Sequence, residues 1–326
     1  MANTDQIKAL IRSHAEGDDS RFYSVALQMA AQSALQGHSR LAEELRALVD
    51  EAKEKGFALP KSNMIPISQP KGELSGLLSL SYPKDRLSSL ILPDVIMHRL
   101  ERIVIEQRQK AKLIKHGLAP RKKILLFGPP GTGKTLTASA LAGELHLPLY
   151  AILFDGLITK YMGETAAKLR LIFDSIDKVR GVYFFDEFDA IGSQRNGTND
   201  VGEIRRVLNS FLQFLEQSNS ESLILAATNN ADLLDKALFR RFDDVIQYHI
   251  PDKTLAIEAF KNRLAIIKRK SLDYDQLAEA SKSLSFAEIS KVCEDAVKRV
   301  VLNEGSMKLT TELVKQCIEE RFTSHR

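Results

Sequence analysis

The chain has little that is typical of a secreted, metal-binding or membrane-spanning protein. It contains two cysteines, Cys293 and Cys317, both in segments with a helical pattern, and no Cys/His spacing typical of a metal site. No apolar run approaches the ~18 residues that a membrane-spanning helix needs. The first residues are polar, so we expect no signal peptide and a location in a reducing cytoplasm.

The chain also has little excess of either charge. Its net charge is +4 over 326 residues, which does not by itself indicate a nucleic-acid partner. Hydrophobic residues make up 44% and charged residues 27%, as in ordinary soluble globular proteins, so the chain can bury a sizeable core. This length is enough for two or three domains.

The strongest motif is the stretch Gly128-Pro-Pro-Gly-Thr-Gly-Lys-Thr135. It lies between an apolar run at 123–127 and a helical pattern at 136–145, and this is the strand–turn–helix context of a phosphate-binding P-loop. Glycines let the backbone N–H groups point at phosphates, and the amino end of the helix adds positive partial charge. We expect Lys134 to reach the β- and γ-phosphates and the Thr135 hydroxyl to bind Mg²⁺.

Polar side chains follow two later apolar runs. The run at 182–185 ends in Asp186 and Glu187, and the run at 223–228 ends at Asn229. A P-loop enzyme needs one carboxylate for Mg²⁺ and a second group that orients the attacking water, and we assign these roles to Asp186 and Glu187. Asn229 is a candidate for positioning that water, although Asn is also common in turns. The predicted nucleotide-binding residues are Gly128, Pro129, Pro130, Gly131, Thr132, Gly133, Lys134, Thr135, Leu136 and Asp186.

The remaining pattern divides the chain into four parts. Residues 1–55 carry three helical patterns and are predicted to form a small helical bundle, and residues 56–89, interrupted by Pro and Gly, a linker. Strands that alternate with helices over 90–250 predict an α/β P-loop NTPase fold with a five-stranded parallel sheet. Residues 251–326 are helical throughout, which predicts a second, all-α subdomain.

The order of the motifs over residues 90–326 resembles that of the AAA ATPases of the AAA+ superfamily. The matching segments are Walker A at 128–135, Walker B at Asp186 and Glu187, sensor 1 at Asn229, and the paired arginines Arg240 and Arg241 that close the second region of homology. The chain is most similar to single-module protein remodellers such as katanin and spastin and to small bacterial AAA ATPases. The resemblance implies an α-helical lid at 251–326.

This resemblance implies a ring of identical subunits, usually a hexamer, that binds ATP and Mg²⁺ between neighbours. Arg240 and Arg241 would then be catalytic in trans, although a surface basic pair is the alternative. The segment Lys160–Glu164 resembles the pore loop of protein-threading members. Residues 1–55 resemble the microtubule-interacting-and-transport module, and a packing extension without a ligand is equally compatible. The implied pore-loop residues are Tyr161, Met162 and Gly163.

Two segments depart from the family's pattern. Phe286 stands where the family often has a glycine, in Ser285-Phe-Ala-Glu288, and this leaves the adenine contact open. The segment Leu90–Pro93 replaces the usual Asp-x-x-Gly turn. No His-Glu-x-x-His occurs, so we expect no metalloprotease fused to this module and no second ATPase module.

We expect an ATP-hydrolysing ring that remodels, unfolds or translocates protein substrates through a central pore. A separate effector such as a protease would bind through the N-terminal helices. Two alternatives remain open: a nucleic-acid motor or loader, which the modest charge does not favour, and a nucleotide-dependent switch or scaffold that does not thread its substrate. The sequence does not identify the substrate, the partner or the ring size.

Overall fold

The chain consists of two compact units, Met1–Ile67 and Ser68–Arg326. Within the first unit, residues 25–31 are helical, and most of the bundle predicted over 1–55 lies outside the described residues. The second unit holds every sheet and long helix considered below. The computed structural model describes residues 25–31, 42, 43, 47, 49, 70, 72–157, 162–188, 200–230, 239–266, 272–302 and 308–323.

A six-stranded sheet with the order β1-β3-β4-β5-β2-β6 forms the centre of the second unit. The strands are β1 (Leu78–Ser81), β2 (Lys123–Phe127), β3 (Leu149–Ile152), β4 (Val182–Phe185), β5 (Leu223–Thr228) and β6 (Asp244–Gln247). Strands β2 to β6 pair in parallel, as predicted, and β1 pairs antiparallel with β3. Every residue of β4 and β5 is buried, as expected for parallel strands covered on both faces.

Strand β1 corrects the predicted count of five strands. It lies within the segment predicted as a linker, 56–89, yet it pairs with β3 from Leu78 opposite Ile152 to Ser81 opposite Leu149. Leu78 is 4% exposed and belongs to the main hydrophobic core. A four-residue run next to Gly and Pro is too short to be separated from an extended linker by its pattern alone, because its pairing partner is distant in sequence.

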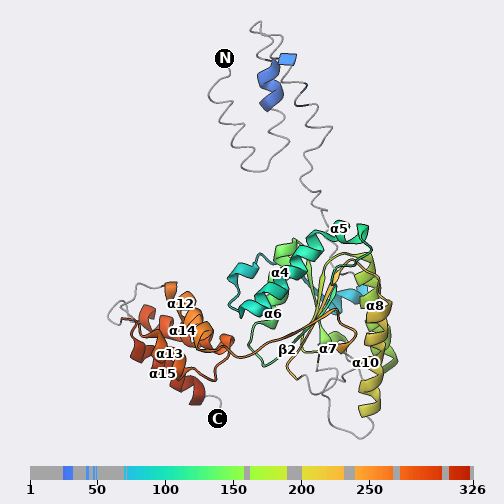
Figure 1. Cartoon of the computed structure of the whole chain (residues 1–326). Coiled ribbons are helices and arrows are strands. Elements are labelled where there is room, and N and C mark those ends of the chain that lie inside the picture. Colours follow the sequence, from blue (N-terminus) through green and yellow to red (C-terminus); the bar gives the residue numbers. More distant parts are fainter. Residues whose placement is uncertain are drawn as a thin grey trace. The chain divides into compact units, whose positions relative to one another are not determined.

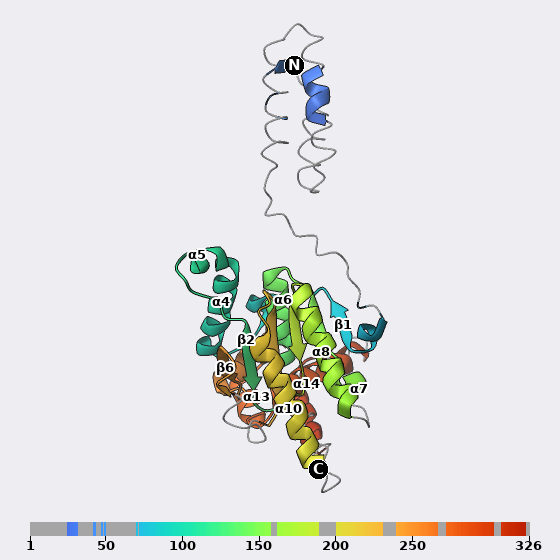
Figure 2. The same ribbon diagram turned by 90° about the vertical axis from the view of Figure 1, so that its right-hand side faces the viewer.

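Helices cover both faces of this sheet (Figure 1). On one face lie α4 (Asp94–Arg108), followed by the short α5 (Lys110–Lys115), and α6 (Lys134–Leu145). On the other face α8 (Met162–Lys178) packs against α10 (Asp200–Gln217), and the short α7 (Phe154–Leu157) precedes α8. The core beneath α8 and α10 is aromatic, with the Phe173 ring 5.6 Å from that of Phe211. Figure 2 shows β1 at the edge of the sheet.

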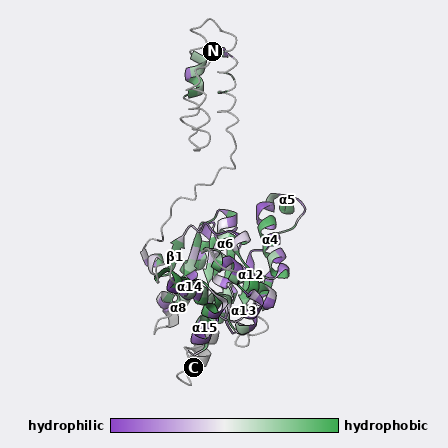
Figure 3. Ribbon diagram, turned by 90° about the vertical axis from the view of Figure 1, so that its left-hand side faces the viewer, coloured by the Kyte–Doolittle hydropathy of each residue, from purple (hydrophilic) through white to green (hydrophobic). Residues whose placement is uncertain are grey.

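The carboxyl-terminal part of the chain is helical wherever the structure describes it, which confirms the predicted all-α subdomain. Its helices are α12 (Lys253–Arg263), α13 (Tyr274–Ala280), α14 (Phe286–Leu302) and α15 (Thr311–Thr323). They enclose a second hydrophobic core that buries Cys293 and Cys317, both as free thiols. Hydrophobic and hydrophilic residues alternate along these helices, as the hydropathy colouring shows (Figure 3). Within the described residues, no helix is long and apolar enough to cross a membrane.

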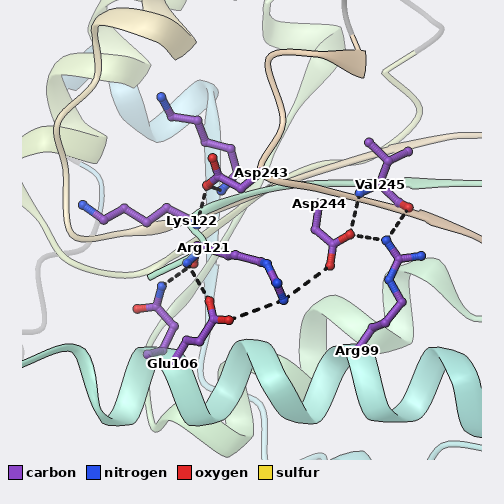
Figure 4. Close-up of polar contacts among 9 residues, drawn as sticks. Arg99, Glu106, Arg121, Lys122, Asp243, Asp244 and Val245 are labelled. Atoms are coloured by element: carbon purple, nitrogen blue, oxygen red, sulfur yellow. Dashed lines mark hydrogen bonds and ion pairs between the residues drawn. The ribbon is translucent and has the colours of Figure 1, made fainter. Parts of the chain in front are cut away.

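Ionic contacts join α4 to the amino ends of β2 and β6 (Figure 4). Arg99 donates to the Asp244 carboxylate and, at 2.8 Å, to the Val245 carbonyl oxygen. A guanidinium nitrogen of Arg121 lies 3.4 Å from Glu106 Oε1 and 3.8 Å from Asp244 Oδ2. Because the Asp244 side chain is only 11% exposed, these contacts compensate a largely desolvated charge and hold α4 against the start of β6.

Candidate nucleotide-binding site

The turn between β2 and α6 has a backbone that requires glycine. Gly128 and Gly131 have φ values of 144° and 72°, in the region that side-chain-bearing residues rarely adopt. A Cβ at Gly128 would overlap the Tyr248 carbonyl oxygen, and one at Gly131 would lie 2.5 Å from Ser285 Oγ. Both positions therefore exclude a side chain through conformation and through space, and the turn approaches β6 and α14 closely.

Lys134 begins α6 and is 6% exposed. Its Nζ donates to the carbonyl oxygens of Gly128 at 2.7 Å and Pro129 at 2.9 Å, and to Asn229 Oδ1 at 2.8 Å. A buried ammonium group needs such oxygen partners, since an uncompensated charge is strongly disfavoured in the interior. The positive charge is thus held under the turn, next to the end of β5.

Two carboxylates lie at the carboxyl end of β4. Asp186 Oδ2 accepts a hydrogen bond from Thr135 Oγ1 at 2.7 Å, and Asp186 Oδ1 accepts one from the Glu187 N–H at 2.9 Å. Glu187 has a φ of 50°, a left-handed conformation that disfavours a non-glycine residue by about 1–2 kcal/mol. The Phe188 N–H then donates to the Ala227 carbonyl oxygen at 2.8 Å, which keeps the chain beside β5 immediately after this strained residue.

Neighbouring strands explain why these side chains meet. β4, β5 and β2 are adjacent and parallel, so the residues that follow them share one edge of the sheet. A cavity of about 510 Å³ lies at this edge, a volume in the range of small-molecule sites. From the turn it is lined by Pro130, Gly131, Gly133, Lys134, Thr135 and Leu136. From the strand ends it is lined by Asp186, Glu187 and Asn229.

A second cavity of about 380 Å³ adjoins the first, and the two share Gly133, Leu136, Arg263, Phe286 and Ser290. Thr132 of the turn also lines it. Its apolar wall comes from residues 90–92, which belong to the segment that replaces the usual Asp-x-x-Gly turn. The two cavities therefore differ in one respect: the carboxylates of Asp186 and Glu187 line only the larger one, and the apolar residues 90–92 line only the smaller one.

The amino end of α14 contacts the turn directly. The Ala287 N–H donates to the Gly131 carbonyl oxygen at 3.1 Å. Ser285 and Glu288 form a capping box at this end, with the Ser285 N–H 2.8 Å from Glu288 Oε2. Phe286 lies between them and lines both cavities. The helical subdomain is therefore part of the site.

Three charged residues of the larger cavity were not identified from the sequence. Arg263 ends α12, and Lys291 and Glu294 lie in α14. Exposed charges are common on amphipathic helices, so their residue types carry no signal. The only available signal was their distance from Ser285-Phe-Ala-Glu288, which places Lys291 and Glu294 on the first turns of the same helix.

Tyr248 contacts the first turn of α6, next to the P-loop. Its hydroxyl lies 2.8 Å from Thr137 Oγ1, which donates to the Gly133 carbonyl oxygen at 3.0 Å, and its N–H donates to the Phe127 carbonyl oxygen at 2.7 Å. Burial raises the pKa of the Tyr248 hydroxyl, so the group stays neutral at physiological pH. The first turn of α6 is thereby fixed to the chain that follows β6.

Some predicted residues lie apart from the two cavities. Arg241 forms an ion pair with Glu216 of α10, Arg240 is exposed, and neither lines either of these two cavities. Tyr161 lies outside the described residues, and for Met162 and Gly163 only the helical backbone at the start of α8 is described. The proposed roles of these residues remain predictions.

The part of the chain that the structure describes has no group of three or more His, Cys, Asp or Glu side chains that could hold a metal ion alone. Mg²⁺ does not need such a group, because it commonly keeps water ligands and takes one or two protein oxygens together with substrate phosphates. The hydrogen-bonded oxygens of Thr135 and Asp186 match that requirement.

Comparisons with known proteins agree with this geometry. Residues 124–250 match the family described as "ATPase family associated with various cellular activities (AAA)". An uncharacterized AAA family ATPase, y4kL, of Sinorhizobium fredii is 33% identical over 302 residues, which cover 93% of this chain and 90% of that protein. Among solved structures, the FIGL-1 AAA domain has a TM-score of 0.58 at 21% identity and supports the fold, covering 76% of this chain and 89% of that one.

Two further relatives are much longer than the region they share with this chain. A proteasome-activating nucleotidase of Methanococcus vannielii is 34% identical over 212 residues, 63% of this chain and 52% of that protein. An ATP-dependent zinc metalloprotease FtsH of Parabacteroides distasonis is 35% identical over 256 residues, 69% of this chain and 37% of that protein. The chain thus spans about half of the first and little more than a third of the second.

Proposed function

This chain belongs to the AAA family of ATPases, and on that premise we propose that it hydrolyses ATP between the P-loop and α14. One observation carries the proposal. The side chains with the chemistry of phosphoryl transfer come from the start of α6 and from the residues that follow β4 and β5, and they line a single cavity. They are Lys134, Thr135, Asp186, Glu187 and Asn229.

Each of these side chains has a defined task in the proposed reaction. Thr135 and Asp186 would hold Mg²⁺, which would neutralise charge on the phosphates. Lys134 binds the β- and γ-phosphates through the ammonium group that now contacts Asn229. Glu187 orients the attacking water and accepts its proton, and the Asn229 amide fixes the position of that water. The second cavity, with its apolar wall at 90–92, takes the adenine base.

We propose that the active site is completed by a neighbouring subunit in a ring, most simply a hexamer. Arg240 is exposed and lines neither cavity of its own subunit, which is compatible with its action on the nucleotide of a neighbour. A head-to-tail interface that closes on itself gives such an arrangement. Arg241 has the same proposed role, although in the free chain it pairs with Glu216.

We further propose that ATP hydrolysis drives the remodelling of protein substrates in the cytoplasm. Two relatives carry names that connect ATP use with proteolysis, a proteasome-activating nucleotidase and an ATP-dependent metalloprotease. Tyr161, Met162 and Gly163 would contact an extended substrate in the pore, because apolar and aromatic contact is tolerant of sequence. Residues 1–55 would recruit the substrate or a separate effector, and the part of segment 56–89 that precedes β1 would connect them to the ATPase unit. Residues 251–326 would form the lid of that unit.

The test uses the full chain with Glu187→Gln, which we expect to bind ATP and to lose hydrolysis. Polypeptides that copurify with this variant in ATP are then identified. We expect them to be lost when Tyr161→Ala is added and to be kept with Tyr82→Ala, a matched change at a tyrosine that is 52% exposed. Copurified nucleic acid, with ATPase activity that depends steeply on salt, would instead favour a nucleic-acid motor. An ATP-bound assembly that carries neither polypeptide nor nucleic acid would favour a switch or scaffold.

A further inference from the structure

One loop of the ATPase unit carries exposed apolar and basic side chains together. It runs from Gln107 through α5 to Arg121, just before β2, and we call it the α5 loop. Figures 1 and 2 show α5 at the periphery of this unit. Ile114 and Leu118 of the loop are 60% and 58% exposed. We propose that the α5 loop docks an acidic segment of a partner protein that also carries apolar side chains.

This surface is separate from the nucleotide-binding site. The α5 loop precedes β2 and so lies at the amino end of that strand, whereas the P-loop follows the carboxyl end of β2. The five residues of the strand separate the two ends by about 13 Å. No residue of 107–121 lines either of the two cavities described above. The inference therefore goes beyond the proposed ATPase function, and a partner on the loop would leave the cavities open.

The base of the α5 loop is fixed to the rest of the unit. Gln107 Nε2 donates to the Arg121 carbonyl oxygen at 2.6 Å, and the Arg121 N–H donates to Glu106 Oε2 at 3.0 Å, so the two ends of the loop are held together. The ion pair between Arg121 and Glu106 is drawn in Figure 4. Lys110 donates to the carboxylate of Glu221, which lies shortly before β5. The loop is therefore a defined projection of the unit.

The backbone at the end of α5 is also fixed. The Gly117 N–H donates to the Ile114 carbonyl oxygen, and the Leu118 N–H donates to the Leu113 carbonyl oxygen, both at 3.0 Å. This is the Schellman pattern, which places a left-handed residue after the helix, and Gly117 has a φ of 72°. Ile114 and Leu118 are thus held within one turn of each other. Apolar groups that are already in place lose little conformational freedom when they bind a partner.

The lysines beside these apolar residues have no carboxylate of their own. The sequence contains no Asp or Glu from 107 to 143. Arg108, near the base of the α5 loop, pairs with Glu144 at 2.8 Å. Lys112 and Lys115 are exposed, and within the described part of the chain neither takes part in an ion pair. The positive charge of the loop is therefore compensated near its base and uncompensated around α5.

This combination of side chains resembles the organisation of a protein–protein interface. Ile114 lies between Lys112 and Lys115 in the sequence, and Leu118 follows one turn later. Protein interfaces commonly have an apolar centre with a polar rim, and charges on the rim favour partners of the opposite sign. The complementary surface is a segment with carboxylates around one or two apolar side chains.

Other anionic partners fit the α5 loop less well. Proteins that bind nucleic acids use arginines and aromatic rings for phosphates and bases. The two arginines of the loop, Arg108 and Arg121, already pair with carboxylates, and residues 107–121 include no Phe, Tyr or Trp. Aromatic residues are also typical of segments that lie at a membrane surface. Aliphatic side chains next to lysines favour an acidic protein segment.

The experiment places a photo-crosslinking amino acid at position 114 of the full chain, in the cells that make this protein. Mass spectrometry identifies the linked segment, which we expect to be acidic and to belong to another protein. Adding Lys112→Glu and Lys115→Glu should lower the yield of this product about fivefold, because like charges then face the partner. Lys282→Glu with Lys298→Glu, the same change in net charge on exposed lysines of the helical subdomain, should lower it less than twofold.

A synthetic copy of the linked segment then measures affinity for the full chain by fluorescence anisotropy. Leu118→Ser should weaken its binding about tenfold, since one large apolar side chain is no longer buried in the complex. Val95→Ser is the matched control, because Val95 is 73% exposed in α4 and lies outside the α5 loop. We expect this control to bind the segment within twofold of the unchanged chain.

Three results would overturn the inference. The first is a linked product that is a second copy of this chain, a nucleic acid or a lipid, and the second is no product beyond that obtained with the crosslinker at Val95. The third is loss of ATPase activity in the variant with Lys112→Glu and Lys115→Glu, which would assign the loop to the active assembly. We expect that variant to keep its activity within twofold. Absence of ATPase activity in the unchanged chain would instead contradict the proposed function, so the two failures are distinguishable.

Discussion

Asn229 Oδ1 lies 2.8 Å from the Lys134 ammonium, so the amide that follows β5 contacts the cation of the P-loop directly. β5 lies between the strand that leads to the P-loop and the strand that leads to Asp186 and Glu187. Asn229 is therefore adjacent to both the phosphate-binding cation and the carboxylates. A change in the position of Lys134 must change the surroundings of this amide.

Replacement of Asn229 should affect turnover more than binding. In Asn229→Ala, Lys134 keeps the two carbonyl oxygens of the P-loop, but the group that orients water is lost. We expect kcat to fall about 10- to 100-fold and the ATP Kd to change less than threefold. Steady-state ATPase assays and equilibrium binding measure the two effects. Asn230→Ala is the control, because Asn230 lines neither cavity and its N–H keeps its bond to Thr228 Oγ1. Equal losses in the two variants would contradict the assignment.

Because the backbone at Glu187 is left-handed, we expect a glycine at this position to make the protein more stable than an alanine, the reverse of the usual order. Both Glu187→Ala and Glu187→Gly remove the carboxylate, but only glycine adopts a φ of 50° without strain. We expect the glycine variant to be about 1 kcal/mol more stable to urea than the alanine variant. Glu258 is exposed in α12, and there we expect the alanine variant to be about 1 kcal/mol more stable than the glycine variant. The same order at both positions would show that the strain at Glu187 is absent in solution.

The contacts of Asp244 should matter more for stability than those of an exposed aspartate. Asp244→Ala leaves Arg99 and Arg121 without their shared carboxylate at a position that is 11% exposed. We expect the free energy of unfolding to fall by about 2–3 kcal/mol. Asp295→Ala removes the ion pair with Lys298, in which the aspartate side chain is 58% exposed. This change should lower the free energy of unfolding by less than about 1 kcal/mol. Urea titrations of both variants make the comparison, and similar losses would refute it.

The Cys293 thiol should make stability depend on pH in the alkaline range. Burial raises its pKa from 9.0 to about 12, so the folded state keeps the proton that the unfolded state loses. The stabilisation is complete below pH 9 and is lost as the pH rises from 9 toward 12, by up to about 1.4 kcal/mol per pH unit. Cys293→Ala should make the fall in the free energy of unfolding between pH 9 and 10 less steep, whereas Cys317, Tyr183 and Tyr248, whose pKa values burial also raises, contribute to the slope of both proteins. Urea unfolding across this interval tests the slope, and an unchanged slope would exclude the thiol as its source.

The sequence predicted the P-loop side of the site because local chemistry determines it. The motif at 128–135 is contiguous, and Asp186, Glu187 and Asn229 each follow an apolar strand, so their meeting at one edge follows from a parallel sheet. The helical subdomain was predicted for the same reason, since its periodicity is local. These features needed no knowledge of which distant segments pair.

The residues that the sequence did not identify depend on contacts between distant segments. β1 becomes a strand only through its pairing with β3, about 70 residues away in the chain. Arg263 and Lys291 line the cavity only because α14 docks on Gly131. The apolar wall at 90–92 likewise belongs to the site only after α12 and the P-loop are in place. Residue type alone cannot distinguish such positions from an ordinary solvated surface.

Strand β1 also has a mechanical consequence. Residues 1–67 are joined to the ATPase unit through the segment that leads into Leu78–Ser81, so tension along the chain from that side passes through the 3-10 turn Gly72–Gly76 to this strand. Its four residues are held by the ladder to Leu149–Ile152 and by the bond from the Leu153 N–H to the Leu77 carbonyl oxygen at 2.9 Å. β3 continues through α7 to the segment that contains Tyr161. A load on the N-terminal unit therefore pulls on the strand that leads to the predicted pore loop, and this short ladder sets the force at which the edge of the sheet would peel away.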